Sequence, residues 1–504
     1  MTFISPWFLG GLCVLFVLYY TLPKRAQWPL LLLASLGFYA LAGWAVLAAM
    51  LVTVAVSYGV AMHMGKLKIA QKAHVAQHRD AMTRDERKAY NAAQKRQQRT
   101  WLIAGLLFNF SLLAGVKIAE ALARVEIIPS MIFFVGISYY MFRISGYLID
   151  VFWGKVEVQR NPLKLALFTI FFPYAMIGPI SRYNNVADSL LGEKRMDWDM
   201  FGRGLQRIIW GFFKVMIIGF RLLLAINHLR AYPGEYSGMF AFFTMLVWGA
   251  YLYADFSGAI DISIGIAMCF GIRVEENFVS PFRARDIFDY WRRWHITMGT
   301  WFRDYVFYPM SVAKPLQKLP TRLKIHIATL VTWFTTGIWH GVAWNFIVWG
   351  LANGVVIMIS QELKPLYAKF NAKFSFTKSK AYTCFAVLRT FLLLTLIRSF
   401  DIYFDVPLTF RHFASFITNP QFGAFFRYFG ENDVWFDLAP LEWLVAGLAV
   451  VVLIAVPWFR REARGDAPAK RPPAIFWALL VLAIFIFGTY GLGFDMQYFF
   501  YMQF

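Results

Sequence analysis

Two histidines stand out because their surroundings are otherwise apolar or aromatic. His340 closes the apolar stretch Leu323–His340. His295 follows Trp294 in the segment Pro281–Tyr305, which interleaves aromatic residues with Arg and Asp at helical spacing. A titratable ring at membrane depth loses hydration that lipid cannot replace, so such residues usually face a wet cavity or a partner. Histidine is also well suited to proton transfer near neutral pH. We therefore expect the two rings to meet in one cavity.

The rest of the chain supplies apolar elements to position these rings. Of the 504 residues, 59% are hydrophobic, 19% aromatic and only 16% charged, and the mean hydropathy is +0.51. Apolar runs of about 20 residues, the length of a spanning helix, recur from Phe3 to Tyr490. We predict one all-α polytopic membrane domain over residues 1–504, with about twelve spanning or re-entrant helices plus interfacial amphipathic helices. The first run, Phe3–Leu22, lacks the basic start and cleavage site of a signal peptide, so we expect a retained helix.

The net charge of +21 is distributed in a way that predicts membrane orientation. Lys and Arg outnumber Asp and Glu by ten to three in His63–Arg99, by five to one in Gln361–Lys380 and by five to two in Arg460–Arg471. Phe400–Glu442 has the opposite bias, with six acids against two Arg. Placing the basic loops in the cytoplasm puts the acidic segment and both termini outside. The first of these loops, residues 63–100, is expected to be a charged helix or hairpin. Orientation and anionic lipid explain the basic residues, so we expect no nucleic-acid binding.

Metal, disulfide and nucleotide chemistry find little support in the sequence. Cys13, Cys269 and Cys384 lie in apolar runs without CxxC pairs, so we expect buried thiols with neither a disulfide framework nor a zinc site. His74 and His78 are four residues apart in the basic loop, but no carboxylate or Cys at ligand spacing completes a metal site. The G-x-S-x-G and G-x-x-x-x-G-K-[ST] motifs are both missing, which argues against a lipase-like hydrolase and an ATP-driven pump.

Two segments between the apolar runs do not fit a spanning helix. Pro281–Tyr305 carries too much charge, so we expect an amphipathic helix at the cytoplasmic interface. Its Arg303 and Asp304 could bind a donor phosphate or simply cap that helix, and Trp294 is a further donor-binding candidate. Leu165–Ile180 is broken by proline and glycine and is predicted to be a re-entrant element.

Acidic residues within apolar runs have a structural explanation as well as a functional one. Asp255 and Asp261 are six residues apart on one such run and are not superposed on a helix. Each could pair with an arginine such as Arg143 or Arg283, and we favour structural ion pairing over direct catalysis. Together with Trp339 they are candidates for structural or tunnel-lining residues.

Many of these residues fall in blocks that resemble the membrane-bound O-acyltransferase family. The likeness is to its bacterial branch, which contains the alginate O-acetyltransferase membrane subunit and the teichoic-acid D-alanyl transfer protein. The blocks follow the family's order and mark a core over residues 135–350. They are Val135–Tyr140, Tyr147–Val151, Phe171–Pro179, Asp255–Gly258 with Asp261, Glu276–Phe278, Tyr290–Ile296, Trp301–Tyr305 and Gly337–Gly341 with Trp344. The aromatic ending Gln497–Phe504 also resembles the family's tail, although an interfacial anchor explains it equally well.

The resemblance implies an enzyme that transfers an acyl group from a thioester to a hydroxyl across the membrane. It assigns His340 as the general base that takes the hydroxyl proton. It assigns His295 as a second active-site residue, a donor that stabilises the oxyanion of the intermediate. It also implies a ring of tilted helices around a funnel or tunnel in the bacterial inner membrane. No metal or permanently bound cofactor is required, because the donor, acetyl-CoA or an acyl carrier protein thioester, is a substrate.

The resemblance leaves the acceptor open. It is a cell-surface polysaccharide, or a hydroxyl of a periplasmic or extracellular relay protein that modifies one. We favour acetyl transfer, and hence O-acetylation of the cell envelope, because the motif Trp291–His295 is closer to the alginate-type member. Carrier-protein-dependent transfer of D-alanine to a cell-wall polymer is an alternative. Two further alternatives are a non-catalytic scaffold and a transporter of a lipid-linked sugar, although the sequence shows none of the repeats expected of a transporter.

Overall fold

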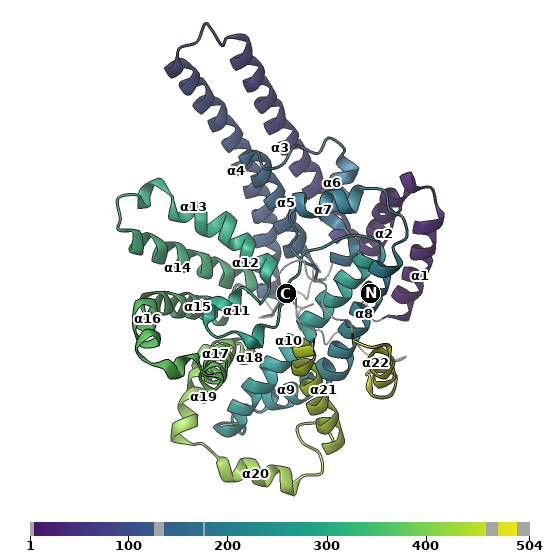
Figure 1. Cartoon of the computed structure of the whole chain (residues 1–504), viewed down its shortest axis with the longest axis vertical. Coiled ribbons are helices and arrows are strands. Elements are labelled where there is room, and N and C mark those ends of the chain that lie inside the picture. Colours follow the sequence, from purple (N-terminus) through teal and green to yellow (C-terminus); the bar gives the residue numbers. More distant parts are fainter. Residues whose placement is uncertain (1–4, 125–135, 175–176, 460–471, 491–504) are drawn as a thin grey trace. The chain divides into compact units, whose positions relative to one another are not determined.

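The structure, a computed structural model, describes residues 5–124, 136–174, 177–459 and 472–490, and these residues form helices without a β-strand (Figure 1). The basic loop Arg460–Arg471 and the aromatic ending Gln497–Phe504 lie outside these ranges. The chain divides into two compact units. Unit 1 is Met1–Gly204 with Ile266–Glu275, and unit 2 is Leu205–Gly265 with Glu276–Met502.

The helices are numbered in chain order from α1 to α22. The first ten are α1 (Pro6–Thr21), α2 (Gln27–Ala42), α3 (Trp44–Gln77), α4 (Arg84–Arg124), α5 (Ile137–Trp153), α6 (Pro162–Ile170), α7 (Tyr183–Leu191), α8 (Trp198–Phe212), α9 (Phe220–Ala231) and α10 (Met239–Cys269). The others are α11 (Ile287–Trp291), α12 (Ile296–Phe302), α13 (Tyr308–Ser311), α14 (Thr321–His340), α15 (Trp344–Glu362), α16 (Lys364–Lys373), α17 (Lys380–Arg398), α18 (Phe400–Tyr403), α19 (Val406–Thr418), α20 (Phe422–Glu431), α21 (Pro440–Phe459) and α22 (Ala474–Phe487). The π-helical segments η3 (Phe213–Gly219) and η5 (Arg303–Phe307) continue α8 and α12.

Length and composition make this a multi-pass membrane protein. Within the described residues, six helical stretches are long and apolar enough to cross a membrane: Trp44–Gln77, Arg84–Ala119, Trp198–Ala231, Met239–Cys269, Trp344–Glu362 and Lys380–Tyr403. Shorter apolar helices cover Pro6–Thr21, Pro162–Tyr174, Pro440–Val456 and Ala474–Phe487. The predicted all-α polytopic architecture is confirmed, whereas the total of about twelve spanning or re-entrant helices stays a prediction.

The cysteines follow the prediction only in part. All three are free thiols, and Cys269 is buried as expected. Cys13 on α1 and Cys384 on α17 are exposed, so the prediction of burial is wrong for both. The physical reason is that an apolar helix in a membrane protein can turn its apolar side chains toward lipid as well as toward a core.

In unit 1, residues 63–100 form the ends of α3 and α4, which lie side by side as a helical hairpin (Figure 1). The Gln71 side chain bridges the two helices, because its Nε2 donates to Asn91 Oδ1 at 2.6 Å. The start of α4 is a capping box: the Thr83 backbone N donates to Glu86 Oε2 at 2.8 Å, and the Glu86 backbone N donates to Thr83 Oγ1 at 3.3 Å. This local pattern explains why the turn falls where it does.

Both segments that the sequence set apart are interrupted. Across Leu165–Ile180, helix α6 ends at Ile170 and a short 3₁₀ turn over Phe172–Tyr174 follows, with its side chains buried. Pro281–Tyr305 is not the single amphipathic helix that was predicted, because it is divided into a 3₁₀ turn, the five-residue α11 and α12. The break before α12 falls at His295, whose φ of 46° ends any regular helix.

In unit 2, glycines let α14 and α15 pack closely. A Cβ added to Gly350 would lie 2.4 Å from the backbone oxygen of Trp333, and one added to Gly337 would lie 2.5 Å from the backbone oxygen of Phe346. Real Cβ atoms do not approach so closely, so the two helices can meet at this distance only where Cβ is missing. The contact fixes the end of α14, where His340 is the last residue.

Candidate active site

One small cavity in unit 2 brings the two predicted histidines together. Its volume is about 20 Å³, room for about one water molecule. Its polar lining consists of His295, His340, Arg398 and Asp401. The remaining lining is apolar and mainly aromatic: Leu252, Trp291, Trp294, Met298, Phe346 and Trp349. Such a lining screens charge weakly, so electrostatic interactions within it are stronger than in water.

Aromatic rings hold His340 at the end of α14. The centroid of its imidazole lies 4.6 Å from that of Trp339 and 4.7 Å from that of Trp349. The Phe346 ring lies nearly parallel to it, 6.3 Å away. Gly341 follows at once and ends the helix. The ring is therefore confined on several sides while it still contributes to the cavity lining.

His295 lies in a turn that Asn277 holds in place. His295 is only 1% exposed and has left-handed backbone geometry. Such geometry costs about 1–2 kcal/mol for a residue with a Cβ. The Asn277 backbone oxygen accepts a hydrogen bond from Ile296 N at 3.0 Å. Its side-chain Oδ1 accepts from Thr297 N at 3.1 Å and from Thr297 Oγ1 at 2.9 Å. The same oxygen lies 3.2 Å from His295 Nδ1. One buried asparagine, through its backbone and side-chain oxygens, thus binds three successive residues and offsets the backbone strain.

These contacts fix the tautomer of His295. The Thr297 backbone N–H can only donate, so the Asn277 atom that faces it must be the amide oxygen. An oxygen acceptor requires the proton to be on His295 Nδ1, which leaves the lone pair of the neutral ring on Nε2. Burial, and then the neighbouring His340, lower the pKa of His295 well below its ordinary value. At neutral pH the ring is therefore neutral, and Nε2 is a hydrogen-bond acceptor.

Arg398 and Asp401 complete the polar lining, and sequence reasoning missed both. Arg398 ends α17 and is only 5% exposed. Its guanidinium carbon lies 3.7 Å from the centroid of the Trp294 ring, a close cation–π contact, and its Nη2 donates to the Tyr290 hydroxyl. The signal was present in the sequence, because Arg398 and Asp401 are charged residues inside an otherwise apolar run.

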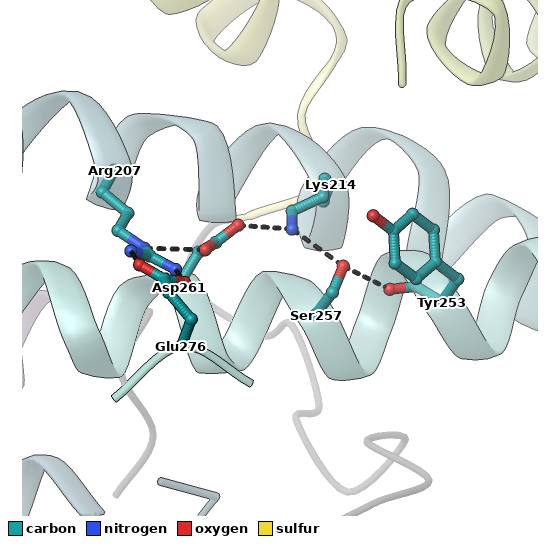
Figure 2. Close-up of polar contacts among 6 residues, drawn as sticks. All are labelled: Arg207, Lys214, Tyr253, Ser257, Asp261 and Glu276. Atoms are coloured by element: carbon teal, nitrogen blue, oxygen red, sulfur yellow. Dashed lines mark hydrogen bonds and ion pairs between the residues drawn. The ribbon is translucent and has the colours of Figure 1, made fainter. Parts of the chain in front are cut away.

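A second polar cluster in unit 2 contains four charged side chains in contact with one another (Figure 2). Asp261 Oδ1 accepts from Arg207 Nε at 2.8 Å, and its Oδ2 pairs with Lys214 Nζ. Arg207 also donates both terminal nitrogens to Glu276, the residue before Asn277. Lys214 Nζ donates in addition to Ser257 Oγ at 2.8 Å. Every charge in the cluster therefore has an opposite charge in contact.

The cluster revises the partners predicted for the two aspartates. Asp261 is ion-paired, but with Arg207 and Lys214 rather than with Arg143 or Arg283. Asp255 is 3% exposed, and its Oδ2 has no hydrogen-bond partner among the described residues. The predicted ion pair between Asp255 and an arginine is therefore wrong. The reason is geometric, because the two aspartates face different neighbours on α10.

The donor-binding candidates end up in different places. Arg303 Nε donates to Asp304 Oδ1 at 2.9 Å in η5, and the two side chains are 53% and 30% exposed. Neither residue lines the cavity. Trp294 is 3% exposed, lines the cavity and lies under Arg398. Trp339, a candidate structural residue, lies with its ring centroid 6.2 Å from that of His295.

Comparison with known proteins relates the chain to enzymes of acyl transfer. Residues 158–400 match the model of MBOAT, the membrane-bound O-acyltransferase family. The chain is 29% identical to the probable alginate O-acetylase of Azotobacter vinelandii over 379 residues, 72% of this chain and 69% of that protein. The identity to the probable alginate O-acetylase of Pseudomonas syringae pv. tomato is 30% over 378 residues, 72% and 67% of the two chains. The identity to the teichoic acid D-alanyltransferase of Bacillus subtilis is 29% over 265 residues, 50% and 64%.

Proposed function

Because the chain belongs to the membrane-bound O-acyltransferase family and is an acyltransferase, we propose that it moves an acetyl group from a cytoplasmic thioester to a hydroxyl outside. The acceptor is a cell-surface polysaccharide or a relay transferase that acts on one. The observation that carries the proposal is the cavity lined by both His295 and His340 within an aromatic wall. Its volume of about 20 Å³ favours a small acyl group over a long chain. The names of the alginate relatives support acetyl as that group.

In this proposal His340 is the general base. An alcohol is a poor nucleophile at neutral pH, so its proton passes to the His340 imidazole as its oxygen attacks the thioester carbonyl. The carbonyl electron pair moves to oxygen, and the intermediate then collapses with cleavage of the C–S bond. The imidazolium returns its proton to the departing thiolate. The ester, the free thiol and a neutral His340 are the products of the cycle.

His295 has a different role from the one expected from the sequence. Its Nδ1 proton is directed at Asn277, and its Nε2 is an acceptor in the neutral ring. A lowered pKa keeps the ring neutral, so it does not donate to an oxyanion. Its Nε2 lone pair instead offers an acceptor to the imidazolium that forms on His340 in the same cavity.

We propose that the protein lies in the bacterial inner membrane with the basic hairpin turn of α3 and α4 in the cytoplasm. The excess of Lys and Arg in residues 63–100 supports this orientation, and it places both termini outside. A cysteine introduced at Asp80, in a protein whose three native cysteines are replaced by serine, tests it. The thiol should react with an impermeant maleimide only after the inner membrane is opened. Labelling in intact spheroplasts would mean that the hairpin turn lies outside, and the proposed orientation would be wrong.

The function is tested by the ester content of the cell surface. Cells that lack the native protein are complemented with wild type, His340→Ala or the matched control His326→Gln at equal membrane levels. His326 lies on the same helix, where its Nε2 contacts Glu362 Oε1 at 3.0 Å outside the cavity. Mild alkali releases the acyl groups, and mass spectrometry identifies them. We expect acetate from wild type and the control, and a loss of at least about a hundredfold in His340→Ala.

Other outcomes would favour the alternatives. Release of D-alanine would favour the alternative of carrier-dependent transfer to a cell-wall polymer. The Bacillus subtilis relative is named a teichoic acid D-alanyltransferase. An ester content that survives His340→Ala would leave a scaffold or a transporter of a lipid-linked sugar as the better explanation. Purified wild-type protein in vesicles separates these further, since neither a scaffold nor a transporter cleaves a thioester.

A further inference from the structure

The guanidinium of Arg398 is fixed in place but has an unused donor. Its flat face lies over the Trp294 ring, and its Nη2 is committed to the Tyr290 hydroxyl. Among the described residues, Nη1 has no hydrogen-bond partner although the atom is buried. A buried cationic N–H without a partner costs about 1–3 kcal/mol or more, and one that lines a cavity is a candidate to bind a ligand there.

The polar lining of the cavity favours a ligand that becomes negative only during the reaction. Asp401 lies in the same lining, three residues after Arg398. Arg398 and Asp401 do not form an ion pair with each other. Among the described residues, Asp401 Oδ1 also has no hydrogen-bond partner. A permanent anion such as phosphate would meet that carboxyl group in a cavity with room for about one water molecule. A neutral carbonyl can instead enter and develop its charge beside Nη1.

The histidines leave this donor role open. His295 has its Nδ1 proton on Asn277 and a lone pair on Nε2, and His340 is the base in the proposed reaction. In these roles neither ring supplies a donor to the negative oxygen. A tetrahedral intermediate needs such a donor, since one preorganised hydrogen bond to an oxyanion is worth about 2.7–4 kcal/mol.

We propose that Arg398 is a catalytic residue whose Nη1–H binds the carbonyl oxygen of the acyl thioester and stabilises the oxyanion. The inference rests on the proposed acyl transfer. As the C–O bond to the alcohol forms, the carbonyl electron pair moves to the oxygen, which accepts the hydrogen bond from Nη1. Arg398 donates this hydrogen bond without giving up its proton. When the electron pair returns, the C–S bond breaks and the thiolate takes its proton from His340.

Steady-state kinetics of purified protein in vesicles, with acetyl-CoA as donor, test the role. We expect Arg398→Met to lower kcat about 10²–10³-fold with little change in KM, because the lost interaction exists mainly in the transition state. Added methylguanidinium should restore part of the rate to this variant. The matched control is Arg389→Met on the same helix, where an exposed arginine donates to the Arg285 backbone oxygen. Its kcat should equal that of wild type.

A second variant tests the same role if Arg398→Met does not fold. Folding is judged by the melting temperature in detergent. Arg398→Lys keeps the cation but loses the flat stack on Trp294 and the fixed direction of the donor, so kcat should fall about tenfold or more. A normal kcat in the folded variant would overturn the inference. So would a raised KM with unchanged kcat, which indicates binding of a permanent anion. Turnover lost in His340→Ala but kept in both Arg398 variants overturns only this inference, whereas turnover kept in all three also overturns the proposed function.

Discussion

The paired cluster around Asp261 and the cavity around His295 and His340 both lie in unit 2, yet they use their charges in opposite ways. In the first, Asp261, Arg207, Lys214 and Glu276 contact one another, and no charge is left over (Figure 2). In the second, Arg398 Nη1 and Asp401 Oδ1 have no hydrogen-bond partner within the described chain. Paired charges hold helices in register, whereas an unused donor beside two imidazoles is available to a substrate.

The two regions are also connected along the chain, because each includes one of two adjacent residues. Glu276, which Arg207 binds, directly precedes Asn277, which fixes the His295 turn. The ion cluster can therefore be understood as the anchor of the segment that positions one catalytic ring. The comparison predicts that substitutions in the cluster act first on stability, and that substitutions in the cavity act first on rate.

The largest effect on stability is expected from Asp261→Leu. The substitution leaves Lys214 and one side of Arg207 without an opposite charge, and breaking such a buried pair costs about 3–5 kcal/mol. We expect a lower melting temperature in detergent and a lower level in the membrane. The double variant Asp261→Leu, Lys214→Met removes both charges and should recover part of the loss. If the single variant melts like wild type, the cluster is not the anchor that the comparison requires.

The next effect is expected where helix packing positions His340. Gly350→Ala places a Cβ 2.4 Å from the Trp333 backbone oxygen, so α14 and α15 must separate at a cost of about 1–3 kcal/mol. Because His340 ends α14, kcat should fall at least about tenfold as well. Gly423→Ala on α20 is the control, since its added Cβ meets no atom within 4 Å. A normal kcat in a destabilised Gly350→Ala variant would show that this packing does not position the base.

Asn277 offers a test of the cavity through pH. Wild-type His295 has a lowered pKa, so the neutral ring persists below its ordinary pKa of about 6.5 and activity should not fall there on its account. In Asn277→Asp the carboxylate accepts the same hydrogen bonds but favours the imidazolium, which raises that pKa. Activity should then be lost as the pH falls through a higher value. Asn277→Leu, without an acceptor, should lower kcat about tenfold to a hundredfold at every pH.

The experiment is a pH profile of kcat for the three proteins between pH 5 and 9, with melting temperatures as the check on folding. An acid limb that stays in place in a folded Asn277→Asp variant would mean that the amide does not control the protonation of His295. Equal kcat values for Asn277→Leu and wild type would mean that the tautomer is not important for the rate.

The sequence predicted the parts of this arrangement that local pattern and membrane physics determine. Apolar runs gave the multi-pass helical fold, and two histidines in apolar surroundings indicated a shared cavity. The left-handed turn at His295 was not predictable, because it depends on hydrogen bonds that Asn277, 18 residues earlier in the chain, accepts. The partners of Asp261 were equally hidden, since many arginines compete in sequence and only packing selects Arg207. Arg398 could have been found, because an arginine in an apolar run is itself a signal.

The smallest effect is expected from an ion pair that has neither burial nor a cavity. Asp199 and Arg203 are four residues apart on α8, 3.0 Å from each other and about half exposed. Solvent screens such a pair, so Asp199→Asn should change stability by at most about 0.5 kcal/mol, part of it from the favourable position of the acid in the first helical turn. The measurement is the melting temperature in detergent at low and high salt, beside Asp261→Leu. If Asp199→Asn lowers the melting temperature as much as Asp261→Leu does, then contact alone, and not burial, determines what these charges contribute to stability. The distinction between the clusters would then lose its physical basis.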